Sequence, residues 1–198
     1  MLPETLIVID TLVTRLDALG IGYFIGGSVA SSMHGIYRAT NDADIVVDLS
    51  ENRVEDLVAA LQEDFYVDAD MIRDALRHSH SFNVIHLPTM VKADLFPPKR
   101  TAFGASEWTR RRQERIRDNE MQAVYVASAE DMILQKLSWY RLTGERSDRQ
   151  WGDVQGMLKV QGTSLDFVYL AHWAADLAVS DLLQTALEDA GLEQEKEG

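Results

Sequence analysis

The chain reads Ile25-Gly26-Gly27-Ser28 and, after an interval long enough for one short helix, Arg38-Ala39-Thr40-Asn41-Asp42-Ala43-Asp44-Ile45-Val46-Val47. A glycine pair that opens a helix lets backbone N–H groups approach an anion such as a phosphate. Two carboxylates one residue apart at the start of an apolar strand project from the same face, because side chains in a strand alternate. Oxygen ligands so placed suit Mg²⁺, which takes further ligands from waters and substrate phosphates. Together, the two patterns indicate chemistry on a nucleoside triphosphate.

The residues around the glycine pair predict a strand, a turn and a helix. Tyr23 to Ile25 is expected as a short buried strand and Ser28 to Gly35 as a helix of small residues, so Gly26 and Gly27 lie in the turn. Ser28 is at or near the N-cap, where its hydroxyl stands beside the positive end of the helix dipole. We therefore expect this turn to hold phosphates, and a bulky side chain at Gly27 to weaken phosphate binding while leaving the fold largely intact.

A third aspartate lies on a strand further along the chain. Ser81 to Met90 and Val91 to Phe96 are predicted to form two strands, and Asp94 lies inside the second. An unpaired charge would be costly there, so a metal ion or a hydrogen-bonded arginine would account for it. We find no cation close in sequence that is positioned to neutralise Asp42, Asp44 and Asp94. We therefore expect their carboxylates to converge, as two metal ions ~3.5–4 Å apart require.

With Gly26-Gly27-Ser28, Asp42-x-Asp44 and Asp94, the chain resembles the DNA polymerase β-type nucleotidyltransferase superfamily. The resemblance implies a palm-like domain in which Asp42 and Asp44 hold two Mg²⁺ ions. Asp94 would ligate one of them and help to deprotonate the attacking hydroxyl, while the glycine turn would hold the β- and γ-phosphates. Arg38 is assigned to nucleotide binding as well. The chemistry agrees, because a metal pair stabilises both the incoming and the leaving oxygen of an in-line displacement.

A narrower resemblance covers Ser128 to Leu137, Trp139 to Arg141 and Ser147 to Val154. These segments are similar to the helical part of bacterial nucleotidyltransferase-like proteins related to abortive-infection (AbiEii-type) toxins. In those relatives a lysine and a later aspartate accompany the carboxylate site. By position, Lys136 matches the lysine, and Asp148 or Asp153 matches the aspartate.

The residues by themselves leave other interpretations of this helical segment open. Lys136 lies at the edge of the apolar stripe of its helix, so it could equally be a surface lysine whose stem covers apolar neighbours. Arg149 and Asp153 are four residues apart and could form an exposed helical ion pair of small energetic value.

Apolar periodicity and chain breakers predict an α/β (α+β) fold with a mixed sheet and a helical C-terminal part. The resemblance implies that the mixed sheet forms a minimal, palm-like nucleotidyltransferase core. We divide the chain into a core at residues 1–127, a helical extension packed on the core at 128–192 and a disordered tail at 193–198. The helices are expected at 3–19, 28–35, 51–63, 70–77 and from 128 onward, with breaks at Gly144, Gly162 and Val179-Ser180. The strands are expected at 23–25, 44–49, 65–67, 81–90, 91–96, 113–117 and 122–126.

The composition of the chain limits the kinds of site, cellular location and partner that we expect. The 198 residues include no cysteine, which removes disulfides and thiolate metal sites. No apolar run approaches membrane length, and the first residues lack the basic start of a signal peptide, so we expect a cytoplasmic protein with no membrane partner. The formal net charge of −13 argues against broad electrostatic wrapping of nucleic acid.

Basic residues nevertheless gather between Lys99 and Arg117. This stretch carries seven of the 19 lysines and arginines, against only Glu107 and Glu114. It is either a solvated face or a local path for a triphosphate or an RNA backbone toward the site.

Three functions are consistent with these patterns. We favour a Mg²⁺-dependent nucleotidyltransferase that transfers a nucleotide from a nucleoside triphosphate to a hydroxyl of a protein or RNA acceptor, in a setting such as a toxin–antitoxin or phage-defence system. The second is a non-catalytic, antitoxin-like binding module whose acidic surface meets a basic cognate toxin. The third is a small-molecule modifier, such as an aminoglycoside nucleotidyltransferase, whose acidic cleft attracts a cationic acceptor. The sequence does not identify the acceptor.

Overall fold

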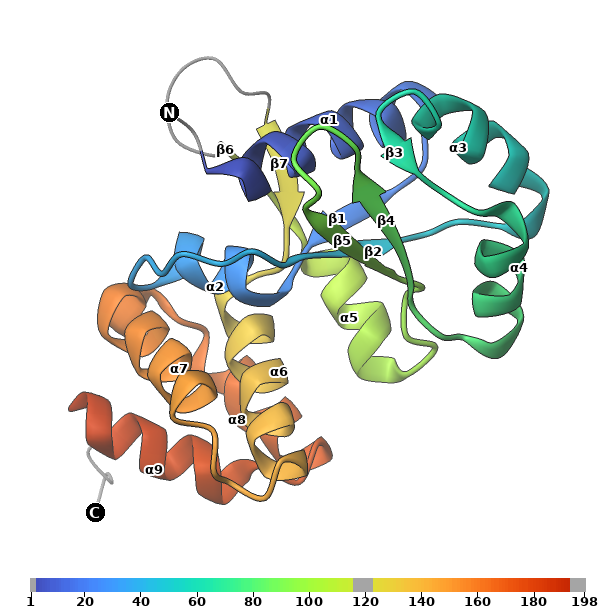
Figure 1. Cartoon of the computed structure of the whole chain (residues 1–198). Coiled ribbons are helices and arrows are strands. Elements are labelled where there is room, and N and C mark those ends of the chain that lie inside the picture. Colours follow the sequence, from blue (N-terminus) through green and yellow to red (C-terminus); the bar gives the residue numbers. More distant parts are fainter. Residues whose placement is uncertain (1–2, 116–122, 193–198) are drawn as a thin grey trace. The chain divides into compact units, whose positions relative to one another are not determined.

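The computed structural model describes residues 3–115 and 123–192 (Figure 1). Three predicted features lie outside the described residues: the disordered tail at 193–198, Arg117 as the last cation of the basic stretch, and residues 116, 117 and 122 of the predicted strands. The chain forms two compact units. The first unit comprises Met1–Val29 and Ala39–Ala127, and the second comprises Ala30–Arg38 and Ser128–Gly198. The boundary between them therefore falls inside helix α2, Gly27–His34.

The first unit is built on a mixed sheet, as the sequence predicts. Its strand order is β3-β4-β5-β2-β1-β7-β6. Strand β2 pairs in parallel with β5, and β1 in parallel with β7, whereas the other neighbours are antiparallel. The strands are β1 (Tyr23–Ile25), β2 (Ala43–Val47), β3 (Phe65–Tyr66), β4 (Phe82–His86), β5 (Lys92–Phe96), β6 (Arg112–Arg115) and β7 (Ala123–Val126).

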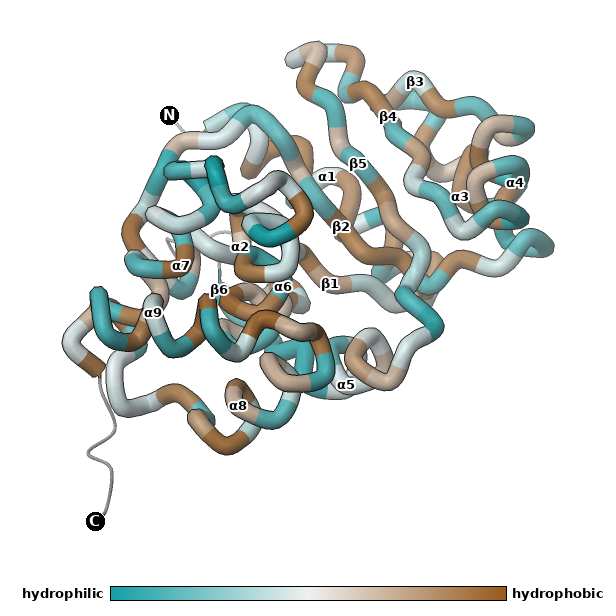
Figure 2. Tube along the Cα trace, turned by 90° about the horizontal axis from the view of Figure 1, so that it is seen from below, coloured by the Kyte–Doolittle hydropathy of each residue, from teal (hydrophilic) through white to brown (hydrophobic). Residues whose placement is uncertain are grey.

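The two faces of this sheet differ in burial. Along β2, Ala43, Ile45 and Val47 are buried and alternate with half-buried Asp44 and Val46, because successive side chains point to opposite faces. Helices pack on the buried face: α1 (Glu4–Leu19), α3 (Val54–Leu61, after a 3₁₀ turn at Glu51–Arg53) and α4 (Ala69–His78). Figure 2 shows the hydrophobic colouring along β1 and β2 that this burial requires.

Helix α5 (Ala102–Arg110) lies on the other side of the sheet from α1 (Figure 1). The ring of its Trp108 lies 5.9 Å from that of Phe24, centroid to centroid. Phe24 is the register partner of Val46, so α5 covers part of the face that carries Asp44.

The second unit is helical, as predicted. Its helices are α6 (Ala129–Leu142), α7 (Asp148–Gln161), α8 (Phe167–Asp176) and α9 (Ser180–Ala190), with a 3₁₀ turn at Gly162–Ser164. Ser128, Ser147 and Asp166 each cap a helix, their side-chain oxygens accepting a hydrogen bond from the backbone N–H three residues on. No helix in residues 3–115 and 123–192 is long and apolar enough to span a bilayer.

Segment 30–38 packs tightly on α7 within the second unit. A Cβ added to Gly35 would lie 2.8 Å from the backbone N of Met157, and one added to Gly156 would lie 3.2 Å from the backbone N of Ile36. The amide of Gln161 donates a hydrogen bond to the carbonyl of His34 at 2.7 Å. These contacts fix the loop that ends at Arg38.

Candidate active site

The first unit brings two of the three predicted aspartates side by side. In the parallel pair of β2 and β5, Asp44 is the register partner of Asp94, so their side chains project from the same face of the sheet. Asp42 lies two residues before Asp44, just outside β2, and is exposed. Asn83 of β4 is the register partner of Asp94 on the other side. A row of polar side chains thus crosses the less buried face.

The glycine turn supports this row directly. The backbone N–H of Gly26 donates to the carbonyl oxygen of Asp44 at 2.9 Å. Gly27 has φ +57°, and a Cβ added to it would lie 1.9 Å from Oδ2 of Asp44. Only glycine therefore leaves room for this carboxylate at the start of α2. Our expectation that a bulky residue at Gly27 weakens phosphate binding and leaves the fold largely intact stays a prediction, and the geometry adds that such a residue would displace Asp44.

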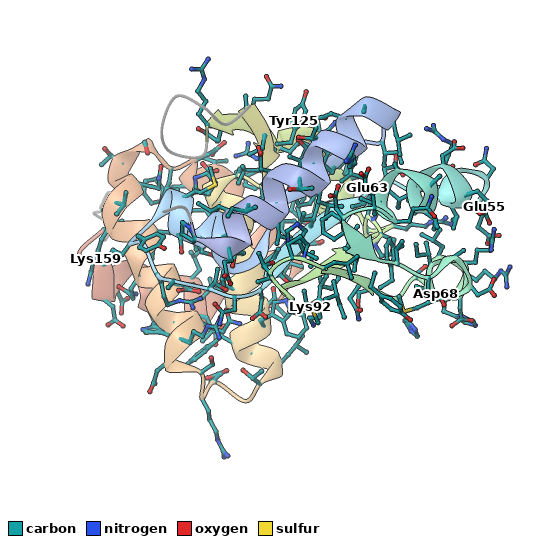
Figure 3. The ribbon with its side chains drawn as sticks, turned by 45° about the horizontal axis from the view of Figure 1, so that its top comes forward. Glu55, Glu63, Asp68, Lys92, Tyr125 and Lys159 are labelled. Atoms are coloured by element: carbon teal, nitrogen blue, oxygen red, sulfur yellow. The ribbon has the colours of Figure 1, made fainter. Side chains whose placement is uncertain are left out.

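A cation that the sequence analysis missed lies among these aspartates. Nζ of Lys92 lies 2.7 Å from Oδ2 of Asp94, and Figure 3 labels Lys92 on β5. The hydrogen bond to Asp94 raises the pKa of Lys92; burial opposes this, while the charges of Asp94, Asp42 and Asp44 add to it. Our statement that no local cation is positioned to neutralise the aspartates is therefore wrong. The period of two along a strand was the signal, since it places Lys92 and Asp94 on one face.

The predicted convergence of three carboxylates is not found. Within the part of the chain that the structure describes, no group of three or more His, Cys, Asp or Glu side chains is arranged to hold a metal ion. Like charges repel, and Asp94 is held by Lys92 instead. The residues nevertheless fit a hard divalent cation, because the carboxylates of Asp44 and Asp94 share one face and Gly27 makes room for Asp44.

The second unit holds a separate group of charges, Arg38, Lys136 and Asp153, which we call the Asp153 cluster. Nζ of Lys136 lies 2.7 Å from Oδ2 of Asp153, and Nε and Nη2 of Arg38 each lie 3.3 Å from one oxygen of that carboxylate. The side chain of Lys136 is only 7% exposed. The interpretation of Lys136 as a surface lysine is therefore wrong. Of the two candidate aspartates, Asp153 is the one that binds it.

The Asp153 cluster carries two cations on one carboxylate. Burial acts to raise the pKa of Asp153, but the hydrogen bonds from Arg38 and Lys136, followed by their charges, outweigh it, so the pKa lies below its usual range. The carboxylate is therefore ionised at neutral pH and binds two cationic side chains.

Part of the basic stretch that begins at Lys99 is used in packing. The guanidinium of Arg111 lies 4.3 Å from the ring centroid of Trp108 and 5.1 Å from that of Tyr125, as in cation–π contacts. Arg112 and Arg115 are exposed on β6. Arg111 is therefore a structural residue of the first unit.

No protein-family model and no curated protein matches the chain. Solved structures do match it. An antigenic nucleotidyltransferase-like protein from Paracoccidioides brasiliensis aligns with a TM-score of 0.57 and 20% identity over 93% of this chain and 92% of that one. ANT(2″)-Ia in complex with adenylyl-2″-tobramycin aligns with a TM-score of 0.57 and 14% identity over 86% and 95%. The lincosamide antibiotic adenylyltransferase LnuA, lincomycin-bound, aligns with a TM-score of 0.51 and 11% identity over 81% and 98%.

The chain therefore has the fold of nucleotidyltransferases, the fold class that the sequence predicts. These similarities do not single out the abortive-infection branch, which stays a prediction.

Proposed function

We propose that this protein is a nucleotidyltransferase that transfers a nucleotide from a nucleoside triphosphate to a hydroxyl of an acceptor. The observation that carries the proposal is the register of Asp44 with Asp94 on one face of the sheet, beside the Gly26-Gly27 turn, in a fold shared with nucleotidyltransferases. Asp42, Asp44 and Asp94 are the proposed ligands of divalent cations, two Mg²⁺ ions in the first instance. When bound, Mg²⁺ would supply positive charge to the phosphoryl oxygens.

The chain's own residues divide the remaining work. Asp94 takes the proton of the acceptor hydroxyl, whose oxygen forms a bond to the α-phosphorus while the bond to pyrophosphate breaks and pyrophosphate leaves. The turn Gly26-Gly27-Ser28 opens α2, whose N-terminus binds the departing phosphates through the helix dipole and backbone N–H groups, while the N–H of Gly26 stays bonded to the carbonyl oxygen of Asp44. Gly27 keeps Asp44 in place by leaving its carboxylate room.

Lys136 and Arg38 are the proposed cations for the triphosphate. Their support is their position, because both side chains bind Asp153, and Nζ of Lys136 lies 2.7 Å from its Oδ2. A positioned ammonium and a guanidinium both suit phosphate oxygens. Asp153 orients them and does not itself touch the nucleotide in this proposal.

The acceptor is proposed by class. A protein or RNA hydroxyl, in a cytoplasmic toxin–antitoxin or phage-defence setting, follows from the resemblance of residues 128–154 described above. A small-molecule acceptor is the second candidate, and one observation favours it: two of the similar structures contain adenylyl-2″-tobramycin and lincomycin. The net charge of −13 would favour a cationic acceptor of this second kind.

The test is transfer of label from each α-³²P nucleoside triphosphate, with Mg²⁺, to total RNA, to lysate protein and to a panel of aminoglycosides and lincosamides. We expect wild type to label one acceptor class, Asp42→Asn and Lys136→Met to lose the transfer, and Asp48→Asn, an exposed carboxylate just after β2, to keep it. A wild type that labels no acceptor, together with an Asp42→Asn variant that still captures a protein partner, would replace the enzyme by the antitoxin-like binding module.

A further inference from the structure

Lys92 lies on β5 beside Asp94, which is the register partner of Asp44 on β2. It precedes Asp94 by two residues on β5, so both side chains project from the face that carries Asp44. Its ammonium lies 2.7 Å from Oδ2 of Asp94 and also within the field of Asp42 and Asp44. The side chain of Lys92 is 47% exposed, and that of Asp94 is 23% exposed. The ammonium thus holds an oxygen that the proposed function assigns to a divalent cation.

We propose that Lys92 is a built-in counter-cation of the carboxylates, which a divalent ion must displace from Asp94 in order to bind, so that Lys92 sets the metal affinity of the site. The inference rests on the proposed function, because it takes Asp42, Asp44 and Asp94 as the metal ligands. It differs from the proposed function in assigning a role to a residue that binds neither metal nor nucleotide.

The geometry favours competition over simple pairing. An ammonium and a divalent ion that both approach Oδ2 of Asp94 at bonding distance repel each other, so each weakens the binding of the other. The lysine stem has four carbons and is half exposed, so the ammonium can swing into solvent without moving the backbone of β5. Three carboxylates with Lys92 carry a charge of −3 + 1 = −2, and without it −3. Removing the ammonium both frees an oxygen ligand and strengthens the attraction for a divalent ion.

The experiment is calorimetric titration of chelator-treated protein with MnCl₂ alone, without nucleotide. We compare wild type with Lys92→Met, which keeps the stem and removes the charge, and with Lys92→Arg, which keeps a cation. Lys159→Met is the matched control, since it removes one exposed positive charge from α7. The unfolding temperature of each variant, with and without Mn²⁺, gives a second readout that needs no enzymatic turnover.

We expect Lys92→Met to bind Mn²⁺ about tenfold more tightly than wild type, as the loss of one nearby unit charge predicts. Lys92→Arg and Lys159→Met should stay within about twofold of wild type. Equal or weaker binding by a folded Lys92→Met would overturn the proposal and leave the proposed function standing. Absence of Mn²⁺ binding in wild type and in Lys92→Met alike would overturn both, because the carboxylates would then hold no divalent ion.

Discussion

Replacing Gly27 by alanine tests whether the glycine turn positions Asp44. The added Cβ would lie 1.9 Å from Oδ2 of Asp44, whereas ordinary contact begins at 3.4 Å, so the carboxylate must retreat by 3.4 − 1.9 = 1.5 Å. Alanine at φ +57° also adds backbone strain of about 1–2 kcal/mol. A misplacement of about 1 Å in a catalytic group can lower the rate by about 100-fold. We therefore expect a nucleotidyl-transfer rate at least about 100-fold below that of wild type.

Gly20→Ala is the matched control, because Gly20 has φ +64° and nothing lies within 4 Å of its added Cβ. Gly20→Ala therefore introduces the same backbone strain as Gly27→Ala, but its Cβ meets no neighbouring atom. Gly20→Ala should lower the melting temperature by about 2–4 °C per kcal/mol of strain and leave transfer intact. Gly27→Ala should lose about 1–3 kcal/mol more of unfolding free energy, the cost of crowding the Asp44 carboxylate, and should therefore melt at a lower temperature than Gly20→Ala. The measurements are the melting curves and the nucleotidyl-transfer rates of Gly27→Ala, Gly20→Ala and wild type. If both variants melt alike and both transfer nucleotide at the wild-type rate, the turn does not position Asp44.

Three further predictions concern the second unit. Asp153→Asn should lower the free energy of unfolding by about 3 kcal/mol in urea, and Lys136→Met by less, because the first leaves two cations without their carboxylate; the reverse order would argue against the pairing. The pKa of Asp153 is lower in the folded protein than in the unfolded chain, so its contribution to stability is present above the unfolded value of about 3.9 and is lost as pH falls through the folded one. Wild type should therefore lose more stability than Asp153→Asn between about pH 5 and pH 3, as urea midpoints would report. Gly35→Ala should destabilise the protein, since its Cβ would meet the backbone of Met157, whereas Gly152→Ala in α7 meets nothing and should stabilise by about 0.5–1 kcal/mol in thermal melts; equal melting temperatures would contradict the close packing.

The sequence predicts local features of this molecule well, because they depend on neighbouring residues. The period of two places Asp44 on the less buried face of β2, and the glycine pair predicts the turn before α2. The same period of two along β5 places Lys92 beside Asp94, so this ion pair also follows from the local sequence.

Contacts between distant segments could not be predicted in the same way. Asp44 and Asp94 are 94 − 44 = 50 residues apart, and their alignment depends on the parallel register of β2 with β5. A slip of one residue would have put Asp94 on the buried face. Likewise, Arg38 contacts Asp153 because segment 30–38 packs on α7. The residues around Arg38 in the sequence do not predict this contact.

The charges on β5 also bear on how the sheet assembles. β2 and the residue pair before it present the acidic side chains of Asp42 and Asp44, and a strand carrying only Asp94 would approach them against electrostatic repulsion. β5 reads Lys92-Ala93-Asp94-Leu95-Phe96 and brings equal numbers of positive and negative side chains. The two strands can therefore pair during folding without an opposing net charge. The acidic row is assembled together with its own neutralising group, before any ligand from solution is needed.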